Sequence, residues 1–197
     1  MRPERRGATL LETMVGAAIF AILTAAIFAI FRMGIGAWFK ADGLAELQQQ
    51  GQAVGGRWVR ETETASLSAV SLSVTGDACS LPSAITPAGV FAIDATTSEL
   101  IWQSYQLYYF DAPSGEVRYL EVPIAPPTMA VVPIEQYTGQ PLANSLVGGR
   151  VLARSVTSFQ VQDVGGVLRL TMVAQRRRPN SMQMEVQTNV FSAAPRN

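Results

Sequence analysis

The sequence predicts an α+β protein in which one long N-terminal helix packs against a C-terminal antiparallel β-sheet head. Three observations carry this prediction. No charged residue stands in the eighteen positions from Met14 to Phe31. Residues 32–65 have apolar positions at helical spacing, and residues 66–197 alternate β-branched and aromatic runs with turn residues. A chain of 197 residues has room for one ordinary domain and one additional element.

The first apolar stretch is long enough to span a membrane. About 20 helical residues at about 1.5 Å each cross a bilayer core of about 30 Å. No Ala-x-Ala cleavage site follows this stretch, so we expect a retained helix over 8–31 and not a removed secretory signal. Because Arg2, Arg5 and Arg6 precede it, we expect a single-pass protein of the inner (cytoplasmic) membrane, with a cytoplasmic N-terminus and the head outside the cytoplasm.

Residues 32–65 are expected to form the amphipathic second half of the same helix. The apolar positions that carry this expectation are Trp38, Leu44, Leu47, Val54 and Trp58. Each glycine inside a helix costs about 1 kcal/mol relative to alanine. The glycines of this half therefore predict bends or local melting near 34–43.

Residues 66–197 are expected to form the β-rich head. The predicted strands cover 66–74, 89–93, 100–110, 116–122, 150–162, 167–175 and 184–191. The turn residues of 111–115 and 165–166 predict two hairpins, and 176–181 predicts a third, wider one. Prolines between 123 and 149 predict a long surface connection without regular strand pairing.

The residue inventory argues against an enzyme. Histidine is absent from the sequence, which removes the commonest general base and metal ligand. Cys79 is the only cysteine, so the chain alone forms neither a disulfide nor a cysteine-based metal site. Paired carboxylates and a phosphate loop are also missing. We therefore expect no catalytic residues, no metal site and no cofactor.

Two features of the head leave a binding role open. Arg176, Arg177 and Arg178 form the only basic cluster, which is either a solvated turn or a contact for DNA phosphates or an acidic partner. Four aromatic residues of the predicted strand 100–110 are either half core or a stacking surface. They are Trp102, Tyr105, Tyr108 and Tyr109. Basic and acidic residues are equal in number, so overall charge favours no nucleic-acid partner.

Glu12 is the main candidate functional residue. It is the only ionisable side chain between Ala8 and Phe31, and a carboxylate within an apolar span is costly and usually functional. Near the edge of the membrane its carboxylate could instead simply reach the lipid headgroups. Gly7 stands five residues before it, at the end of the short basic leader 1–7.

The stretch Gly7-Ala-Thr-Leu-Leu-Glu12-Thr-Met-Val resembles the type III signal of type IV prepilins and of the pseudopilins of type II secretion. Families with this signal have a basic leader, a glycine at the cut site, a glutamate as fifth mature residue and a long apolar helix. The resemblance covers residues 1 to about 32 closely, and the order of helix and strands extends it loosely over the chain. Phenylalanine or methionine is commoner than Ala8 at the first mature position.

The resemblance implies processing and assembly. Prepilin peptidase would cut between Gly7 and Ala8 and methylate the new amine of Ala8. Glu12 would then neutralise the N-terminal amine of a neighbouring subunit as the helix leaves the bilayer. The implied partners are other pilin or pseudopilin subunits, prepilin peptidase and the inner-membrane assembly platform.

Within the superfamily that the signal resembles, the rest of the chain favours a minor subunit with an initiation or tip role. Major pilins often close a C-terminal loop with two cysteines and major pseudopilins can bind calcium through carboxylates, whereas this chain has one cysteine and no cluster of Asp and Asn residues. Its strand-rich head is similar to the larger heads of J-type minor pseudopilins. The alternative from another class is a membrane-anchored binding module of a DNA-uptake or adhesion pilus. Both hypotheses are compatible with the same N-terminal signal.

Overall fold

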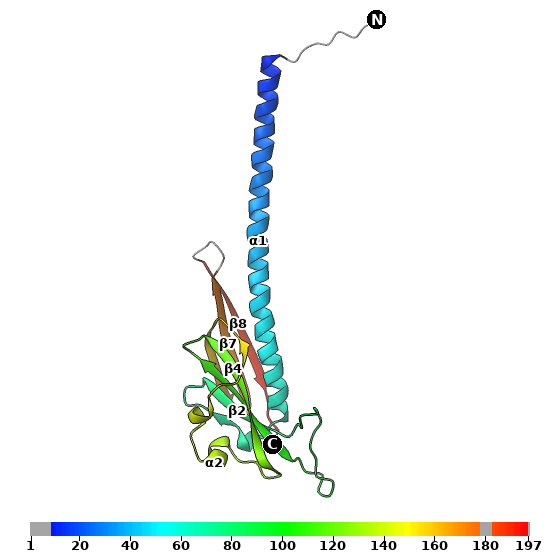
Figure 1. The fold of residues 1–197 in the computed structure, drawn as a ribbon, viewed down its shortest axis with the longest axis vertical. Coiled ribbons are helices and arrows are strands. Elements are labelled where there is room, and N and C mark those ends of the chain that lie inside the picture. Colours follow the sequence, from blue (N-terminus) through cyan, green and yellow to red (C-terminus); the bar gives the residue numbers. More distant parts are fainter. Residues whose placement is uncertain (1–8, 178–182, 197) are drawn as a thin grey trace. The chain divides into compact units, whose positions relative to one another are not determined.

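The computed structural model describes residues 9–177 and 183–196 of the chain (Figure 1). The chain divides into two compact units, Met1–Asp42 and Gly43–Asn197. Helix α1, Leu10–Thr64, contributes to both of them. The strands all belong to the second unit, and the predicted α+β class, with a long N-terminal helix packed against antiparallel sheets, is confirmed.

Helix α1 is continuous from its first to its last residue. The local melting expected near 34–43 is therefore wrong: residues 34–43 are helical throughout. A penalty of about 1 kcal/mol per glycine is small beside the helix-forming alanine, leucine and isoleucine residues of the same helix. In the first unit, all described side chains of this helix are exposed.

In the second unit, α1 buries one face against the strands. Its buried residues there are Gly43, Leu47, Gly51, Val54, Gly55, Trp58 and Thr62. A Cβ atom on Gly51 would overlap the side chain of Asn189, and a Cβ atom on Gly55 would overlap the ring of Phe191. Glycine at these two positions therefore permits strand β8 to approach the helix closely.

Two antiparallel sheets make up the head. The first has the order β1-β2-β3-β4-β5, and its strands are Ser71–Leu72, Ala78–Ser83, Trp102–Asp111, Glu116–Thr128 and Arg150–Ala153. The second has the order β6-β7-β8, with strands Val156–Val164, Val167–Arg177 and Met184–Ala193. Short helices α2, Ile134–Thr138, and η2, Leu142–Ser145, lie between β4 and β5 in the chain.

The three predicted hairpins are confirmed. Strands β3 and β4 pair up to Asp111 and Glu116, and Gly115 between them has φ +63°. Strands β6 and β7 are joined by Gly165 and Gly166, which both have positive φ. Strands β7 and β8 pair over ten successive residue pairs, as the third hairpin requires, but Arg176 and Arg177 of the predicted turn belong to β7. Residues 178–182 lie outside the described residues.

Three of the predicted strands need correction, and one strand was not predicted. The predicted strand 66–74 is reduced to β1, and 89–93 forms only isolated bridges. Strand β2 was not predicted at all. Its residues Ala-Cys-Ser-Leu-Pro-Ser have no β-branched member, yet all six are buried between β1 and β3. The predicted single strand 150–162 is two strands, because Ser155 has φ +58° and the chain changes sheets there.

The expectation that prolines prevent strand pairing between residues 123 and 149 is wrong for residues 123–128. Strand β4 continues through Pro123, Pro126 and Pro127 to Thr128. On its other side it pairs with β5 only at residues 117–119, so the prolines stand where β4 is an edge strand. An edge position tolerates the missing N–H donor of proline.

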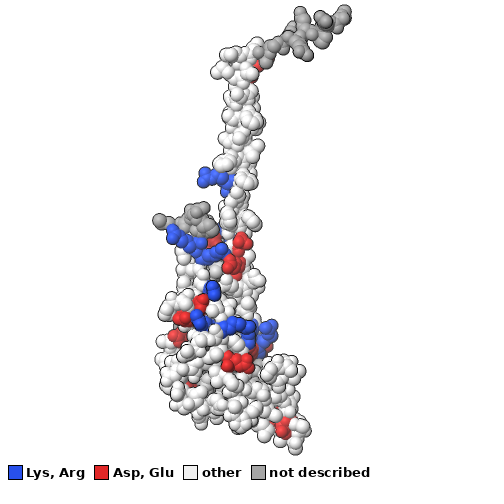
Figure 2. All heavy atoms as spheres, in the orientation of Figure 1, with Lys and Arg blue, Asp and Glu red and all other residues white. Residues whose placement is uncertain are grey.

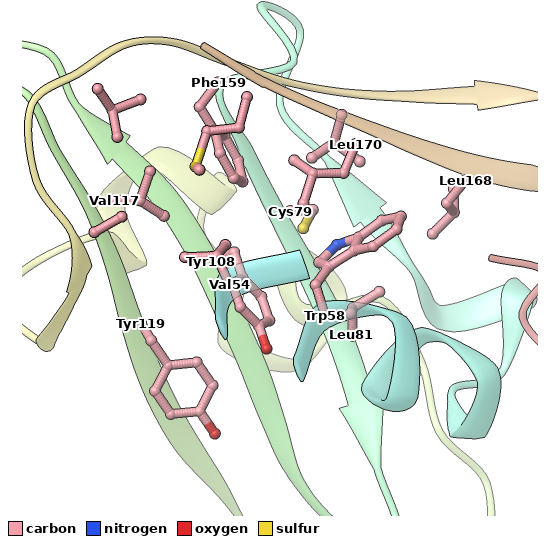
Figure 3. Packing of buried hydrophobic residues seen from close by; sticks show 14 of the residues in the cluster. Val54, Trp58, Cys79, Leu81, Tyr108, Val117, Tyr119, Phe159, Leu168 and Leu170 are labelled. Atoms are coloured by element: carbon pink, nitrogen blue, oxygen red, sulfur yellow. The ribbon is translucent and has the colours of Figure 1, made fainter. Parts of the chain in front are cut away.

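Two hydrophobic clusters hold the head together. The larger one lies between α1 and the two sheets, and Figure 3 shows Trp58 of α1 beside Cys79, Leu168 and Leu170. The second lies on the other face of the five-stranded sheet. There the segment with Ile124, Ile134 and Leu142 packs in one cluster with Tyr105 and Leu107.

Candidate functional site

The candidate site begins at the first turn of α1, where Thr9 and Glu12 cap the helix reciprocally. The backbone N–H of Thr9 donates to Glu12 Oε2 at 2.8 Å, and the Thr9 hydroxyl donates to the same oxygen at 3.2 Å. The backbone N–H of Glu12 in turn donates to Thr9 Oγ1 at 3.3 Å. This is a capping box, in which two otherwise unpaired backbone donors are satisfied.

The capping box gives Glu12 a structural role that the sequence interpretation did not include. The pattern Thr9-x-x-Glu12 before an apolar run could have indicated it. The side chain of Glu12 remains exposed. Of its two carboxylate oxygens, only Oε2 accepts hydrogen bonds from the described residues. The other carboxylate oxygen is therefore accessible to a cation from outside the chain.

The predicted processing residues Gly7 and Ala8 lie outside the described residues. The helix that follows them has an eighteen-residue window of mean hydropathy 2.6, none of it buried. Its large side chains are mostly exposed, with Leu10 at 81% and Phe20 at 72%. Figure 2 shows this part of α1 as a surface almost without charge. The helix is thus long and apolar enough to span a membrane.

A shallow hollow marks the surface of α1 towards the end of the apolar stretch. It is lined by Ile30, Phe31, Gly34, Ile35 and Trp38. A Cβ atom added at Gly34 would meet nothing within 4 Å. Small residues flanked by large apolar ones permit close approach of a second helix, so the hollow is suited to helix packing.

The basic cluster is divided by the structure. Arg176 lies within β7 and forms an ion pair with Glu46 of α1, so it ties the helix to the strand. Arg177 is the last residue of β7. Arg178 lies outside the described residues. The structure therefore brings Arg176 into a contact with α1 within the chain.

The aromatic residues of β3 are core residues. Trp102, Tyr105, Tyr108 and Tyr109 are all less than 8% exposed, because this strand is covered on both faces. The hypothesis that they form a stacking surface is wrong. Alternation along a strand, which leaves half of the side chains exposed, holds only when one face is in water.

A half-buried charged cluster connects α1 to the five-stranded sheet, and the sequence did not single it out. Arg57 Nε lies 2.7 Å from Glu61 Oε1, and the Tyr108 hydroxyl donates to Glu61 Oε2. The Arg57 guanidinium lies over the ring of Tyr119, 3.8 Å from its centroid. Burial raises the pKa of the Glu61 carboxyl, and the Tyr108 hydrogen bond and the Arg57 charge oppose this rise.

Cys79 lies in the larger hydrophobic cluster and is fully buried. Desolvation raises the pKa of its thiol to about 12. The reactive form of cysteine is the thiolate. The Cys79 side chain therefore has a packing role in the folded head.

Comparison with known proteins bears on the first part of the chain. Residues 2–28 match the family described as the prokaryotic N-terminal methylation motif. The match covers the basic leader, Gly7, Ala8, Glu12 and most of the apolar helix, and it supports the resemblance to type IV pilins and pseudopilins. A search of curated proteins found no match, and neither did a search of solved structures.

Proposed function

We propose that the chain is a minor pilin or pseudopilin, a structural subunit that prepilin peptidase processes and that assembles into a type IV pilus or a type II secretion-like filament. One observation carries the proposal. The methylation motif over residues 2–28 coincides with the start of an exposed apolar helix whose first turn holds Glu12. A subunit needs both features if it is cleaved near its N-terminus and its helix then moves out of the bilayer during assembly.

The proposed processing step acts on the Gly7–Ala8 bond. Cleavage there leaves Ala8 as the first residue, with Thr9 as the helix cap directly behind it. The new amine, methylated or not, is a cation near the positive end of the helix dipole, where it is poorly stabilised by its own helix. A carboxylate from another subunit would stabilise it.

Glu12 is the proposed source of that carboxylate. An isolated charge in an apolar filament interior is costly, and pairing the carboxylate with the amine of a neighbour lowers the cost of burying either group. The Oε2 atom serves the cap, while the accessible Oε1 atom accepts the amine of the neighbour. One carboxylate would thus cap its own helix and also set the axial position of the helix of the neighbouring subunit.

The head is proposed to select the neighbouring subunits, and the chain is proposed to have an initiation or tip role in the filament. Within the second unit, the core that Leu47, Val54 and Trp58 of α1 share with both sheets supports a head that is one compact body with this part of the helix. The alternative, a membrane-anchored binding module of a DNA-uptake or adhesion pilus, receives no specific support from the head, since its aromatic strand is buried and Arg176 is ion-paired.

Two matched variants separate the charge of Glu12 from its role in the cap. Glu12→Gln removes the charge and keeps a side chain that suits a capping box, while Thr9→Ala removes the cap and keeps the carboxylate. We expect Glu12→Gln to lose at least tenfold in recovery from a sheared filament fraction, and Thr9→Ala to assemble nearly normally. Normal assembly of Glu12→Gln would contradict the proposed role of the charge.

Intact-mass measurement tests the processing step directly. In cells with prepilin peptidase, the mature chain should begin at Ala8, and a Gly7→Leu variant should keep the leader. A wild-type chain that still begins at Met1 in such cells would overturn the proposal.

A further inference from the structure

The first charges of α1 are spaced by the thickness of a membrane. After Glu12, the next ionisable side chain of the helix is Arg32, twenty residues further along. Twenty helical residues extend about 30 Å at about 1.5 Å each, which is the thickness of a bilayer core. When α1 spans a membrane, Glu12 and Arg32 therefore lie at opposite edges of that core.

The helix surface stays apolar beyond Arg32. Met33 is 75% exposed, Trp38 69% and Phe39 47%. The rings of Trp38 and Phe39 are neighbours, with 6.0 Å between their centroids. Large apolar side chains at this exposure are unfavourable in water, so residues 32–40 require amphipathic surroundings.

The depth of residues 32–40 corresponds to the headgroup layer of a bilayer. This layer adds about 5–8 Å on each side of the core. Trp38 lies about 9 Å beyond Arg32 along the helix axis, and an average tilt of about 20° shortens this distance across the membrane. Tryptophan is enriched at this level of a membrane, because its ring is apolar and its N–H group is polar. Residues 32–40 thus have the position and the composition of an interfacial segment.

Two basic residues give this segment a positive charge. Arg32 and Lys40 are the only charged residues between Glu12 and Asp42, and Figure 2 shows a basic side chain on the otherwise uncharged upper part of α1. Neither Arg32 nor Lys40 forms an ion pair with a residue that the structure describes. Long basic side chains bury their stems in apolar surroundings and keep the charged group among the headgroups. The complementary group at this depth is the anionic phosphate of a phospholipid.

The helix surface between the two basic residues is open to a lipid. At about 3.6 residues per turn, Arg32 and Lys40 lie about 80° apart around the axis, with Gly36 between them. A Cβ atom added at Gly36 would meet nothing within 4 Å. A headgroup can therefore approach the backbone of α1 between Arg32 and Lys40, which are about 12 Å apart along the axis.

We propose that residues 32–40 form an interfacial anchor, in which Arg32 and Lys40 bind phospholipid phosphates and the rings of Trp38 and Phe39 lie among the headgroups. The interfacial anchor fixes the depth of α1 in the bilayer, on the side opposite to Glu12. This inference goes beyond the proposed function, because it needs a helix that spans a membrane and neither cleavage nor a filament.

Fluorescence quenching of Trp38 measures the depth of the interfacial anchor. The full chain is reconstituted in phosphatidylcholine vesicles that contain a lipid brominated either close to the headgroup or close to the end of the acyl chain. Of the three tryptophans, Trp58 and Trp102 are buried in the head, so quenchers in the lipid reach Trp38. We expect quenching by the lipid brominated close to the headgroup to be at least twofold stronger than quenching by the other lipid.

Photo-crosslinking tests the contact with phosphate groups. The vesicles then contain phosphatidylglycerol with a photoreactive headgroup, and the adduct is located by peptide mass mapping. We expect it within residues 32–42, and at least threefold less of it in an Arg32→Gln/Lys40→Gln double variant. The matched control is Arg60→Gln/Arg169→Gln, which removes the same charge from two exposed arginines of the second unit and should leave the adduct unchanged.

Three results would overturn the inference. Equal or stronger quenching by the lipid brominated close to the chain end would place Trp38 in the core, and absence of quenching by both lipids would place it in water or against protein. An adduct outside residues 32–42, or one that the double variant does not reduce more than the control does, would exclude the phosphate contact. The proposed function would stand in each case, since cleavage at the Gly7–Ala8 bond is measured separately by mass.

Discussion

Gly55 and Gly56 are neighbours on α1, yet an added methyl group would meet different surroundings at each. At Gly55 a Cβ atom would overlap three atoms of the Phe191 ring, whereas at Gly56 it would meet nothing within 4 Å. Gly55→Ala and Gly56→Ala gain the same helix propensity, about 1 kcal/mol. Only Gly55→Ala carries an overpacking cost, which is about 1–3 kcal/mol in well-packed sites.

We therefore expect Gly56→Ala to raise the free energy of unfolding of the head by about 1 kcal/mol, and Gly55→Ala to be less stable than Gly56→Ala by about 1–3 kcal/mol. Urea titration of the full chain in detergent micelles measures both values, with the fluorescence of the buried residues Trp58 and Trp102 as the signal. Phe191→Leu in the Gly55→Ala background should recover part of the loss, because the smaller side chain leaves room for the methyl group. Equal stability of the two alanine variants would refute the close approach of α1 and β8.

Other predictions concern the buried groups. Tyr108→Phe leaves a Glu61 oxygen without its hydrogen bond, and we expect it to lower the free energy of unfolding by about 1–3 kcal/mol in the same titration. Burial raises the pKa of Glu61 in the folded head above its ordinary value of 4.5. The folded state therefore binds the Glu61 proton more tightly than the unfolded state, and the contribution of Glu61 to stability falls as the pH rises above that value. The stability of wild type relative to Glu61→Gln should accordingly decrease with rising pH and then level off, and a difference independent of pH would contradict the raised pKa. Cys79 should resist a thiol reagent at pH 8 in the folded chain and react once urea unfolds it, since burial raises its pKa to about 12.

The order of elements was accessible from the sequence because each local signal agreed with the final structure. The uncharged stretch after Glu12 predicted the helix, and the glycines at 115, 165 and 166 predicted hairpins that the positive φ angles confirm. These features depend on residues close together in the chain, where spacing and backbone preference determine the outcome.

Features that depend on distant residues were missed. Strand β2 has no β-branched residue and exists because β1 and β3 enclose it. The contact between Glu61 and Tyr108 joins residues 47 positions apart. The glycines of α1 were interpreted as weak points of the helix, whereas Gly51 and Gly55 admit the side chains of Asn189 and Phe191. Glycine composition alone does not distinguish these two cases.

The contact of α1 with β8 has a mechanical consequence. Along the helix, Gly43, Gly51 and Gly55 meet Glu185, Asn189 and Phe191 in the same order, so the helix and the strand run in the same direction. In the proposed filament, tension along the subunit helices would be passed within the second unit along β8. The hydrogen bonds between β7 and β8 would then be loaded together in shear and not opened one after another, an arrangement that favours a head that stays folded.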